Sequence, residues 1–224
     1  IAEVGATYGI AVSPQDGSVY ASAYLKRFAG FGPGEVGSEG ATGAIYSLTR
    51  DGAPTVLVDL SPDNPNNTTG FNTGANPHPN STTSWPGGAS GGVCDPAWHE
   101  VGRLGWGDID INDDGTQLYA MNMFDRALYI FNTADGSLVS RHVIPGVTDV
   151  FSVADGPTWA ASTCTNDPDQ DLRPMATSYR NGTVYVGIVF SAASTLDDED
   201  LTAYVWEFDL MTSQYAASPL LEFG

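Results

Sequence analysis

Apolar and polar residues alternate along short segments of the chain, and three of these segments match one another. They read TYGIAVSPQDGSVYASAY at 7–24, WGDIDINDDGTQLYAMNM at 106–123 and RPMATSYRNGTVYVGIVF at 173–190. In each copy, two runs with a period of two residues flank a polar turn that contains glycine, which is typical of a β-hairpin. The copies share one aromatic anchor in the second run, at Tyr20, Tyr119 and Tyr185.

A second pair of strands follows each predicted hairpin. The segments 43–60, 126–144 and 202–223 each hold an apolar run with a central aromatic residue, then a short turn and a last run. Those central aromatic residues are Tyr46, Tyr129 and Trp206. Four antiparallel strands per unit, repeated in series, indicate a β-propeller.

The predicted fold class is therefore all-β, as a β-propeller segment of about three four-stranded antiparallel blades within one domain, 1–224. The approximate limits of the blades are 7–60, 106–144 and 173–223, with a long insertion at 61–105. Because propellers close with four to eight blades, we expect the remaining blades to come from another chain or from a missing C-terminal segment. The chain begins with Ile1 rather than Met, and we expect a processed or trimmed form.

Two stretches of the sequence resemble the propeller blades of large bacterial cell-surface proteins. They read GDIDINDDGTQLYAMNMFDRALYIFN and DLRPMATSYRNGTVYVGIVFSA. The blade pattern is similar to that of YVTN-like and NHL-like propellers, and such surface proteins combine it with SdrD B-like repeat domains. The resemblance implies a secreted or surface-displayed scaffold and names no activity.

The charge of the chain excludes several classes of function. Acidic residues number 27 against 8 basic ones, for a net charge of −19. Binding to nucleic acid or to anionic membranes needs Lys and Arg, so neither partner is expected. No apolar run is long enough for a transmembrane helix, and we expect no membrane insertion. An Asp-rich surface with Lys26 as its one lysine favours an extracellular or cell-surface location.

The long connections between the predicted strands all fall on one face of a propeller. They cover 25–42, 61–106, 145–172 and 191–201. Long loops usually carry function, so we expect a ligand-binding site on this face. Most of the carboxylates also fall there, against five basic residues, Lys26, Arg27, Arg103, Arg126 and Arg173. A solvated acidic surface without a partner is the alternative.

Four residues are candidate ligand contacts. Asp108 stands at the head of the first strand of the second blade, near the mouth of the central channel, and we place Arg173 at the matching position of the third. Such residues recognise a ligand or tie loops to the scaffold. Trp98 and Trp106 lie in or beside the long insertion, where aromatic rings stack on sugars or partner surfaces or form a small core.

A calcium site is predicted at Asp167, Asp169 and Asp171, because oxygen ligands at alternate loop positions suit a hard cation. The stretch from Asp110 to Gly115 begins like an EF-hand loop but has Met121 where the late Glu belongs. Ca²⁺ is thus the one cofactor considered, and no catalytic residue is assigned.

The two cysteines, Cys94 and Cys164, both precede a first strand in loops that enter neighbouring blades. We expect a disulfide between them, with two separate thiols as the alternative. Together these features predict an extracellular or cell-surface scaffold of the adhesion type that binds a glycan or a protein through its acidic long-loop face. The alternative is a carbohydrate-active hydrolase or lyase that uses carboxylates at the channel mouth.

Overall fold

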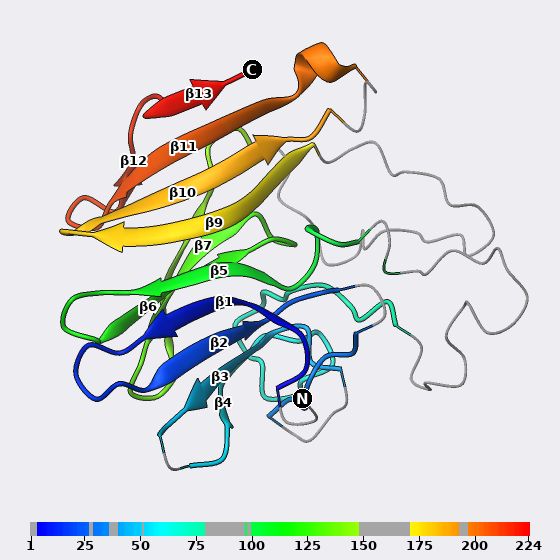
Figure 1. Ribbon diagram of the computed structural model, residues 1–224, viewed down its shortest axis with the longest axis vertical. Helices are drawn as coiled ribbons and strands as arrows, with labels where there is room; N and C mark the ends of the chain where they lie inside the picture. Colours follow the sequence, from blue (N-terminus) through cyan, green and yellow to red (C-terminus); the bar gives the residue numbers. More distant parts are fainter. Residues whose placement is uncertain are drawn as a thin grey trace, which may run out of the picture.

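The computed structural model describes residues 4–26, 29–35, 40–50, 52–78, 97, 100–147, 171–192 and 197–224. Within these ranges the chain is all-β, and its strands form three antiparallel sheets that follow one another along the sequence (Figure 1). A single turn of 3-10 helix lies at Asp198–Asp200. Within these ranges no helix has the length and hydropathy of a membrane span.

We call the three sheets blades 1, 2 and 3. Blade 1 consists of β1 (Thr7–Val12), β2 (Val19–Ala23), β3 (Ala44–Leu48) and β4 (Thr55–Asp59). Blade 2 consists of β5 (Trp106–Ile111), β6 (Gln117–Asn122), β7 (Ala127–Asn132) and β8 (Leu138–Val143). Blade 3 consists of β9 (Leu172–Arg180), β10 (Thr183–Phe190), β11 (Thr202–Asp209), β12 (Gln214–Tyr215) and β13 (Leu221–Phe223). The predicted all-β class and the repeated antiparallel sheets are confirmed.

Blade 3 departs from the predicted four strands at its last position. Two short strands share the outer side of β11 there: β12 pairs with Phe208 and Asp209, and β13 pairs with the stretch from Ala203 to Val205. The residues between them, 216–220, include Pro219, which has no N–H to donate to a ladder. A last strand that would be continuous is therefore split in two.

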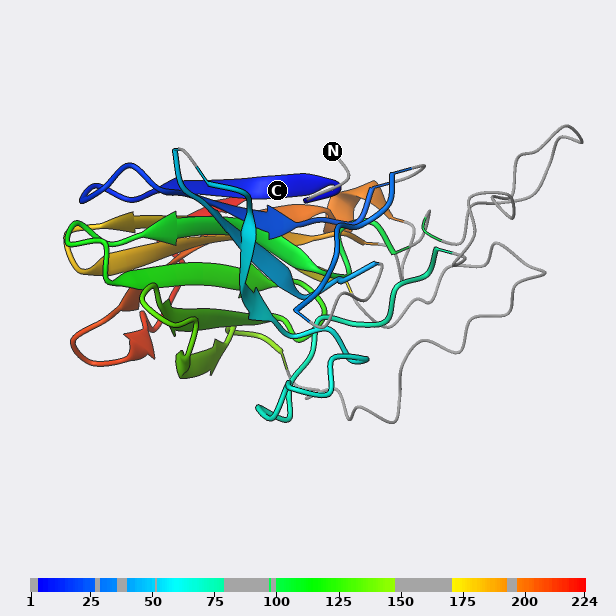
Figure 2. The same cartoon turned by 90° about the horizontal axis from the view of Figure 1, so that it is seen from below.

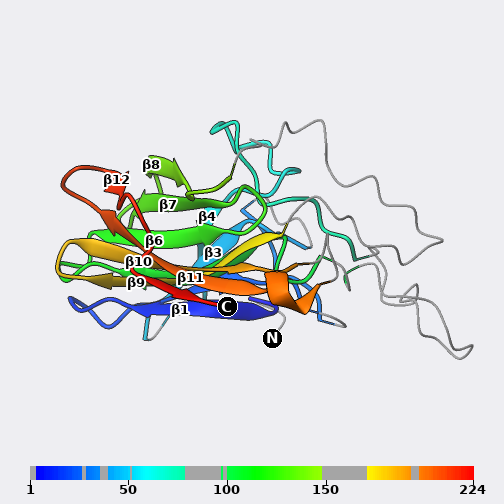
Figure 3. The ribbon, with the colours of Figure 1, turned by 90° about the horizontal axis from the view of Figure 1, so that it is seen from above.

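The three blades are arranged in an arc with their first strands at the inner edge. β1 lies beside β5, and β5 lies beside β9 (Figure 1). Viewed from above, β1 and β9 lie on one side of the molecule and β8 and β12 on the other (Figure 3). Each sheet thus runs from an inner first strand to an outer last strand, as the blades of a propeller do, and the described part forms an arc rather than a closed ring.

The inner strands approach one another backbone to backbone at two glycines. A Cβ added to Gly9 of β1 would lie 2.6 Å from the Ile109 nitrogen, and one added to Gly107 of β5 would lie 2.5 Å from the Met175 oxygen. Real side chains do not fit such distances, so glycine is required where neighbouring inner strands touch. The Ser22 hydroxyl accepts from the Gly9 amide at 3.0 Å and donates to the Gly107 carbonyl at 3.0 Å, which ties blade 1 to blade 2.

A hydrophobic core fills each of the two spaces between blades. Between blades 1 and 2 lie Ala11, Tyr20, Ile45 and Val58 from one sheet and Trp106, Ile109, Leu118, Tyr129 and Phe131 from the other. Between blades 2 and 3 lie Tyr119, Met121, Leu128 and Ile130 from one sheet and Val184, Val186, Ile188 and Phe208 from the other. Both faces of blade 2 are covered, so its middle strands β6 and β7 are apolar on both sides.

His142 on β8 makes the second of these cores sensitive to pH. Its ring packs against the Phe208 ring at 4.4 Å between centroids, and burial, with Arg141 next to it, lowers the pKa of His142. The folded chain therefore binds this proton more weakly than the unfolded chain. The stability that His142 contributes is complete above its ordinary pKa of about 6.5 and is lost as the pH falls below that value and through the lowered pKa of the folded state.

We expect the free energy of unfolding to drop between about pH 7.5 and pH 5.5, and a His142→Phe variant to show a smaller drop. Urea unfolding of both proteins at the two pH values measures the difference. His78 and His99 are unchanged in the variant, so the difference isolates His142. Equal drops in the two proteins would assign the pH dependence to other groups.

Candidate functional site

The two ends of the blades differ in how the strands are connected. At one end, which we call the short-turn end, β1–β2, β3–β4, β5–β6, β7–β8, β9–β10 and β11–β12 are joined by turns of two to six residues, on the left in Figure 1. At the other, which we call the long-connection end, lie the strand ends that flank the longer connections, from β2 to β3, from β4 to β5, from β8 to β9 and from β10 to β11 (Figure 2). Only the β6–β7 connection at that end is short, at 123–126.

A group of charged side chains gathers at the long-connection end of blades 2 and 3. Arg103 precedes β5, Arg126 lies in the β6–β7 connection, and Arg173 lies at the start of β9. Glu100, Arg103, Arg126 and Asp171 are all buried. We call these four residues and Arg173 the arginine cluster. Three of the eight basic residues of a strongly acidic chain thus lie together.

The surroundings of Arg173 disfavour its positive charge. Burial lowers its pKa to about 10, and Arg103 and Arg126 act in the same direction, while Asp171 and Glu100 oppose them. The guanidinium remains protonated at neutral pH, in a position where a negative charge brought close would be stabilised.

The position of Arg173 differs in register from the predicted one. Arg173 pairs with Val189, whereas its neighbour Pro174 pairs with Ile188 and occupies the place that Trp106 has in blade 2. Arg173 therefore does not match Asp108 in the repeat, because the β9–β10 hairpin is two residues shorter between equivalent strand pairs than the β5–β6 hairpin. The structure brings Arg173 together with Arg103 and Arg126, which sequence reasoning had placed on the same face without grouping them.

Asp108 and Asp110 on β5 point to the backbone of β9. Asp110 accepts from the Tyr179 amide at 2.6 Å and from the Ile111 amide at 2.8 Å, one on each oxygen. Asp108 accepts from the Ile109 amide at 3.0 Å and interacts with the Thr177 amide. Burial raises the pKa of Asp108, and these amides oppose the rise. Of the two roles predicted for Asp108, the contacts favour the one that ties the scaffold together, here between blades 2 and 3.

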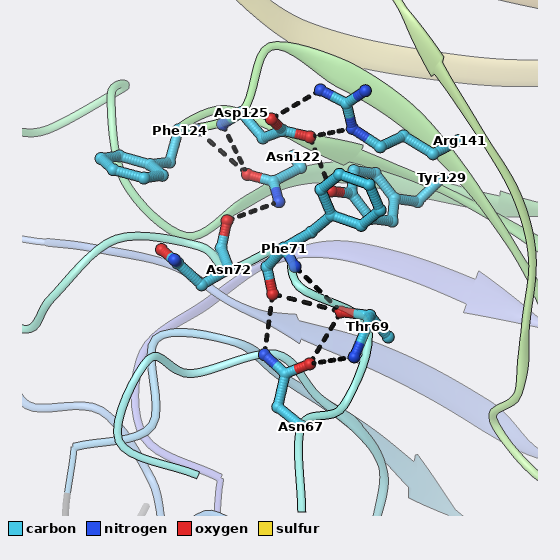
Figure 4. A network of polar contacts seen from close by, with 9 residues as sticks. All are labelled: Asn67, Thr69, Phe71, Asn72, Asn122, Phe124, Asp125, Tyr129 and Arg141. Atoms are coloured by element: carbon cyan, nitrogen blue, oxygen red, sulfur yellow. Dashed lines mark hydrogen bonds and ion pairs between the residues drawn. The ribbon is translucent and has the colours of Figure 1, made fainter. Parts of the chain in front are cut away.

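Part of the long insertion packs against blade 2 through a polar network (Figure 4). The Asn67 side chain donates to the Phe71 carbonyl at 2.7 Å and accepts from the Thr69 hydroxyl at 2.7 Å. The Asn122 amide group of β6 donates to the Asn72 carbonyl at 3.0 Å. Asparagine side chains therefore substitute for a regular ladder and fix residues 67–72 in an irregular conformation.

The same network contains an ion pair on blade 2. Asp125 accepts from Arg141 through both oxygens, at 2.7 Å for the Nη2 contact, and from the Tyr129 hydroxyl at 2.6 Å (Figure 4). The Asp125 carboxylate raises the pKa of Arg141, and the guanidinium lies over the Phe71 ring at 4.6 Å. A bidentate pair over an aromatic ring is among the stronger surface arrangements. It clamps the insertion to blade 2, a role that no sequence motif indicated.

Trp106, predicted as a ligand contact, is a core residue. Its side chain is fully buried between blades 1 and 2, with edge-to-face contacts to Tyr129 at 5.6 Å and Phe131 at 5.7 Å. Its indole N–H donates to the Gly43 carbonyl of blade 1 at 2.8 Å. The core that holds Trp106 is the one between blades 1 and 2 rather than a separate small core under the insertion, because the first position of β5 faces blade 1.

The predicted calcium site and disulfide fall mostly outside the described residues. The residues outside the described part are Asp167 and Asp169 of the calcium site, and both cysteines. Trp98, a predicted ligand contact, also lies outside it. Asp171 is described: it is buried, one oxygen accepts from the Ser191 hydroxyl at 3.2 Å, and Arg173 lies near. Among the described residues, no group of three or more His, Cys, Asp or Glu side chains is placed to hold a metal ion.

Comparisons with known proteins give distant similarities. No protein-family model matches the chain. The chain is similar to Colossin-D of Dictyostelium discoideum, with 28% identity over 196 residues, which cover 86% of this chain and 17% of that protein. It is also similar to a chain of the mitotic checkpoint complex, with 7% identity and a TM-score of 0.37, over 96% of this chain and 50% of the other.

A further solved structure, apo AztD from Citrobacter koseri, matches with 12% identity and a TM-score of 0.33, over 96% of this chain and 49% of the other. The chain thus spans about half the length of these two structures and a much smaller part of Colossin-D. None of the three matches names a bacterial surface protein with SdrD B-like repeats, so that part of the resemblance stays a prediction. The fold assignment rests on the three sheets themselves.

Proposed function

We propose that this chain is a propeller-like scaffold that binds a ligand through its long-connection end, as part of an extracellular or cell-surface protein. The observation that carries the proposal is the arginine cluster at that end. The short-turn end consists of tight turns, which leave little backbone for recognition. The opposite end combines long connections with buried guanidinium groups, which are the usual partners of carboxylate, sulfate or phosphate groups.

The charge of the whole chain limits the kind of ligand. A net charge of −19 repels polyanions over a distance of several ångströms, whereas the arginine cluster favours a negative charge at one point. A ligand that fits both conditions carries a single anionic group on an otherwise neutral or cationic body. An acidic sugar within a glycan and a carboxylate of a protein partner both meet this description.

A glycan array that contains acidic sugars and their neutral parents tests the proposal. We expect the chain to be retained by acidic members and released by salt, because the contact is electrostatic. Retention by the neutral parents alone would contradict a site built on the arginine cluster. A cell-surface location is supported by the Asp-rich, Lys-poor composition, and surface labelling of intact source cells tests it.

A carbohydrate-active hydrolase or lyase is the second candidate, and one observation favours it. Asp108 has a raised pKa, as a general acid requires, and Asp110 lies on the same strand. Both carboxylates nevertheless accept backbone amides. One experiment separates the two candidates. Product release from a polysaccharide panel by the unchanged chain, abolished in the Asp108→Asn variant, would establish the enzyme. Binding without product release by both the unchanged chain and the variant would establish the scaffold.

A further inference from the structure

Blade 1 exposes apolar side chains at positions that are buried in blade 2. Tyr20 of β2 and Tyr119 of β6 are equivalent positions of the repeat, and they pair with Ala11 and Asp110. The residues on either side of these partners are therefore also equivalent: Ile10 and Val12 of β1 correspond to Ile109 and Ile111 of β5. Ile109 and Ile111 are 2% and 8% exposed because blade 1 covers them. Ile10 and Val12 are 60% and 55% exposed. The same face of the repeat is an interface in one blade and open in the other.

The open strip on blade 1 also includes Tyr8, which is 47% exposed. Tyr8, Ile10 and Val12 alternate along β1. We call these three residues the leading face. Apolar side chains at every second position of a strand, exposed together, are typical of a surface that a partner covers.

Blade 3 has a matching open surface at the other end of the arc. In blade 2, Tyr119, Met121, Leu128 and Ile130 form the face that packs against blade 3. The register of blade 3 gives Tyr185, Gly187, Val205 and Glu207 as their counterparts. Beside them on the same face, Val189, Leu221 and Phe223 are exposed, at 39%, 47% and 58%. We call Val189, Leu221 and Phe223 the trailing face.

We propose that the leading face of one copy of this chain docks onto the trailing face of a second copy, and that two such contacts close a six-bladed ring. The contact continues the interface already present between blades 1 and 2 and between blades 2 and 3, with the same faces in the same order. A contact between two different faces joins copies head to tail. It forms a closed ring only when the rotations from one copy to the next add up to a full turn.

The three described blades are consistent with two copies in a ring. Propellers close with four to eight blades, so two copies of a three-bladed arc give six, whereas three copies would give nine. Closure buries both open faces at once, because each copy supplies one leading and one trailing face. This inference concerns assembly and holds whether or not the arginine cluster binds a ligand.

Light scattering coupled to size-exclusion chromatography tests the ring. One copy has a mass of 23.6 kDa, and we expect the unchanged chain to elute at micromolar concentrations with twice that mass. Ile10→Asp on the leading face and Phe223→Asp on the trailing face are each expected to elute with the mass of a single copy. Met211→Asp is the matched control, because Met211 is 94% exposed and lies in the β11–β12 turn, away from both faces. It should elute as the unchanged chain does.

Mixing the two variants distinguishes a head-to-tail contact from a symmetrical one. Ile10→Asp retains an intact trailing face and Phe223→Asp an intact leading face, so the mixture should regain the double mass through one intact contact. Circular dichroism confirms that each variant is folded. A single-copy mass for the unchanged chain would overturn the proposal and assign the open faces to blades of other sequence. A double mass for Phe223→Asp alone would overturn it in favour of two leading faces in contact.

Discussion

Replacing Trp106 with alanine is expected to lower the free energy of unfolding by about 3–5 kcal/mol, the range for removal of a large aromatic side chain from a core. Trp106 is fully buried, and its ring contacts Tyr129 and Phe131 at right angles. Its indole N–H also donates to the Gly43 carbonyl of blade 1, and alanine removes this hydrogen bond, while the Leu60 amide still donates to the same carbonyl. The cavity lies between two blades, and neither sheet relaxes easily into it because the Gly9 contact holds the inner strands together.

Urea unfolding followed by circular dichroism measures this effect. Trp106→Phe serves as the matched variant, because phenylalanine retains much of the volume and loses the indole N–H. It should lie between the parent and the alanine variant in stability. If the alanine variant were as stable as the parent, Trp106 would not be part of the core between blades 1 and 2.

Replacing Asp110 with alanine is expected to cost about 1.5–3 kcal/mol, the usual contribution of hydrogen bonds to a charged group. The two oxygens of Asp110 accept from different strands, one from Tyr179 of β9 and one from Ile111 of β5. Alanine leaves both amides without an acceptor at the inner edge of the arc. Asparagine rescues only part of the loss, because its amide nitrogen is a donor and cannot accept from either N–H.

The control for this prediction is Asp114→Ala. Asp114 is exposed in the β5–β6 turn, and it contacts Gln15 through its backbone carbonyl, which the substitution leaves in place. Removing one carboxylate there should change the stability little. Amide hydrogen exchange provides a local readout: Tyr179 should exchange faster in the Asp110 variant and at the parental rate in the control. Unchanged exchange at Tyr179 would contradict the tie between blades 2 and 3.

The fold could be predicted because the repeat is visible in patterns of residues that are neighbours in the sequence. Alternation with period two and glycine turns recur three times around Tyr20, Tyr119 and Tyr185, and these features depend only on neighbouring residues. The split of the last strand was missed, because Pro219 alone marks the interruption in the sequence and the pairing of both halves with β11 is not a local pattern. The uneven distribution of long connections also followed from the sequence, since strand order alone assigns each connection to an end.

The details of the site required three-dimensional register. Asp108 and Trp106 stand two residues apart, yet one points to β9 and the other into the core between blades 1 and 2. Charged residues far apart in the sequence meet in the arginine cluster, and only the relative placement of blades 2 and 3 brings them together. The pair of Asp125 and Arg141 was missed for the same reason, because it needs the pairing of β7 with β8.

The most direct test of a binding site at the long-connection end compares two arginines on one strand. Arg173 lies at the start of β9, within the arginine cluster, and Arg180 lies at its end, next to the short β9–β10 turn. Arg173→Met and Arg180→Met remove the same charge and leave a side chain of similar length. With the array of acidic and neutral glycans as the probe, Arg173→Met should lose retention on the acidic members, and Arg180→Met should retain the parental pattern. Equal retention by both variants, or loss in Arg180→Met alone, would contradict the account.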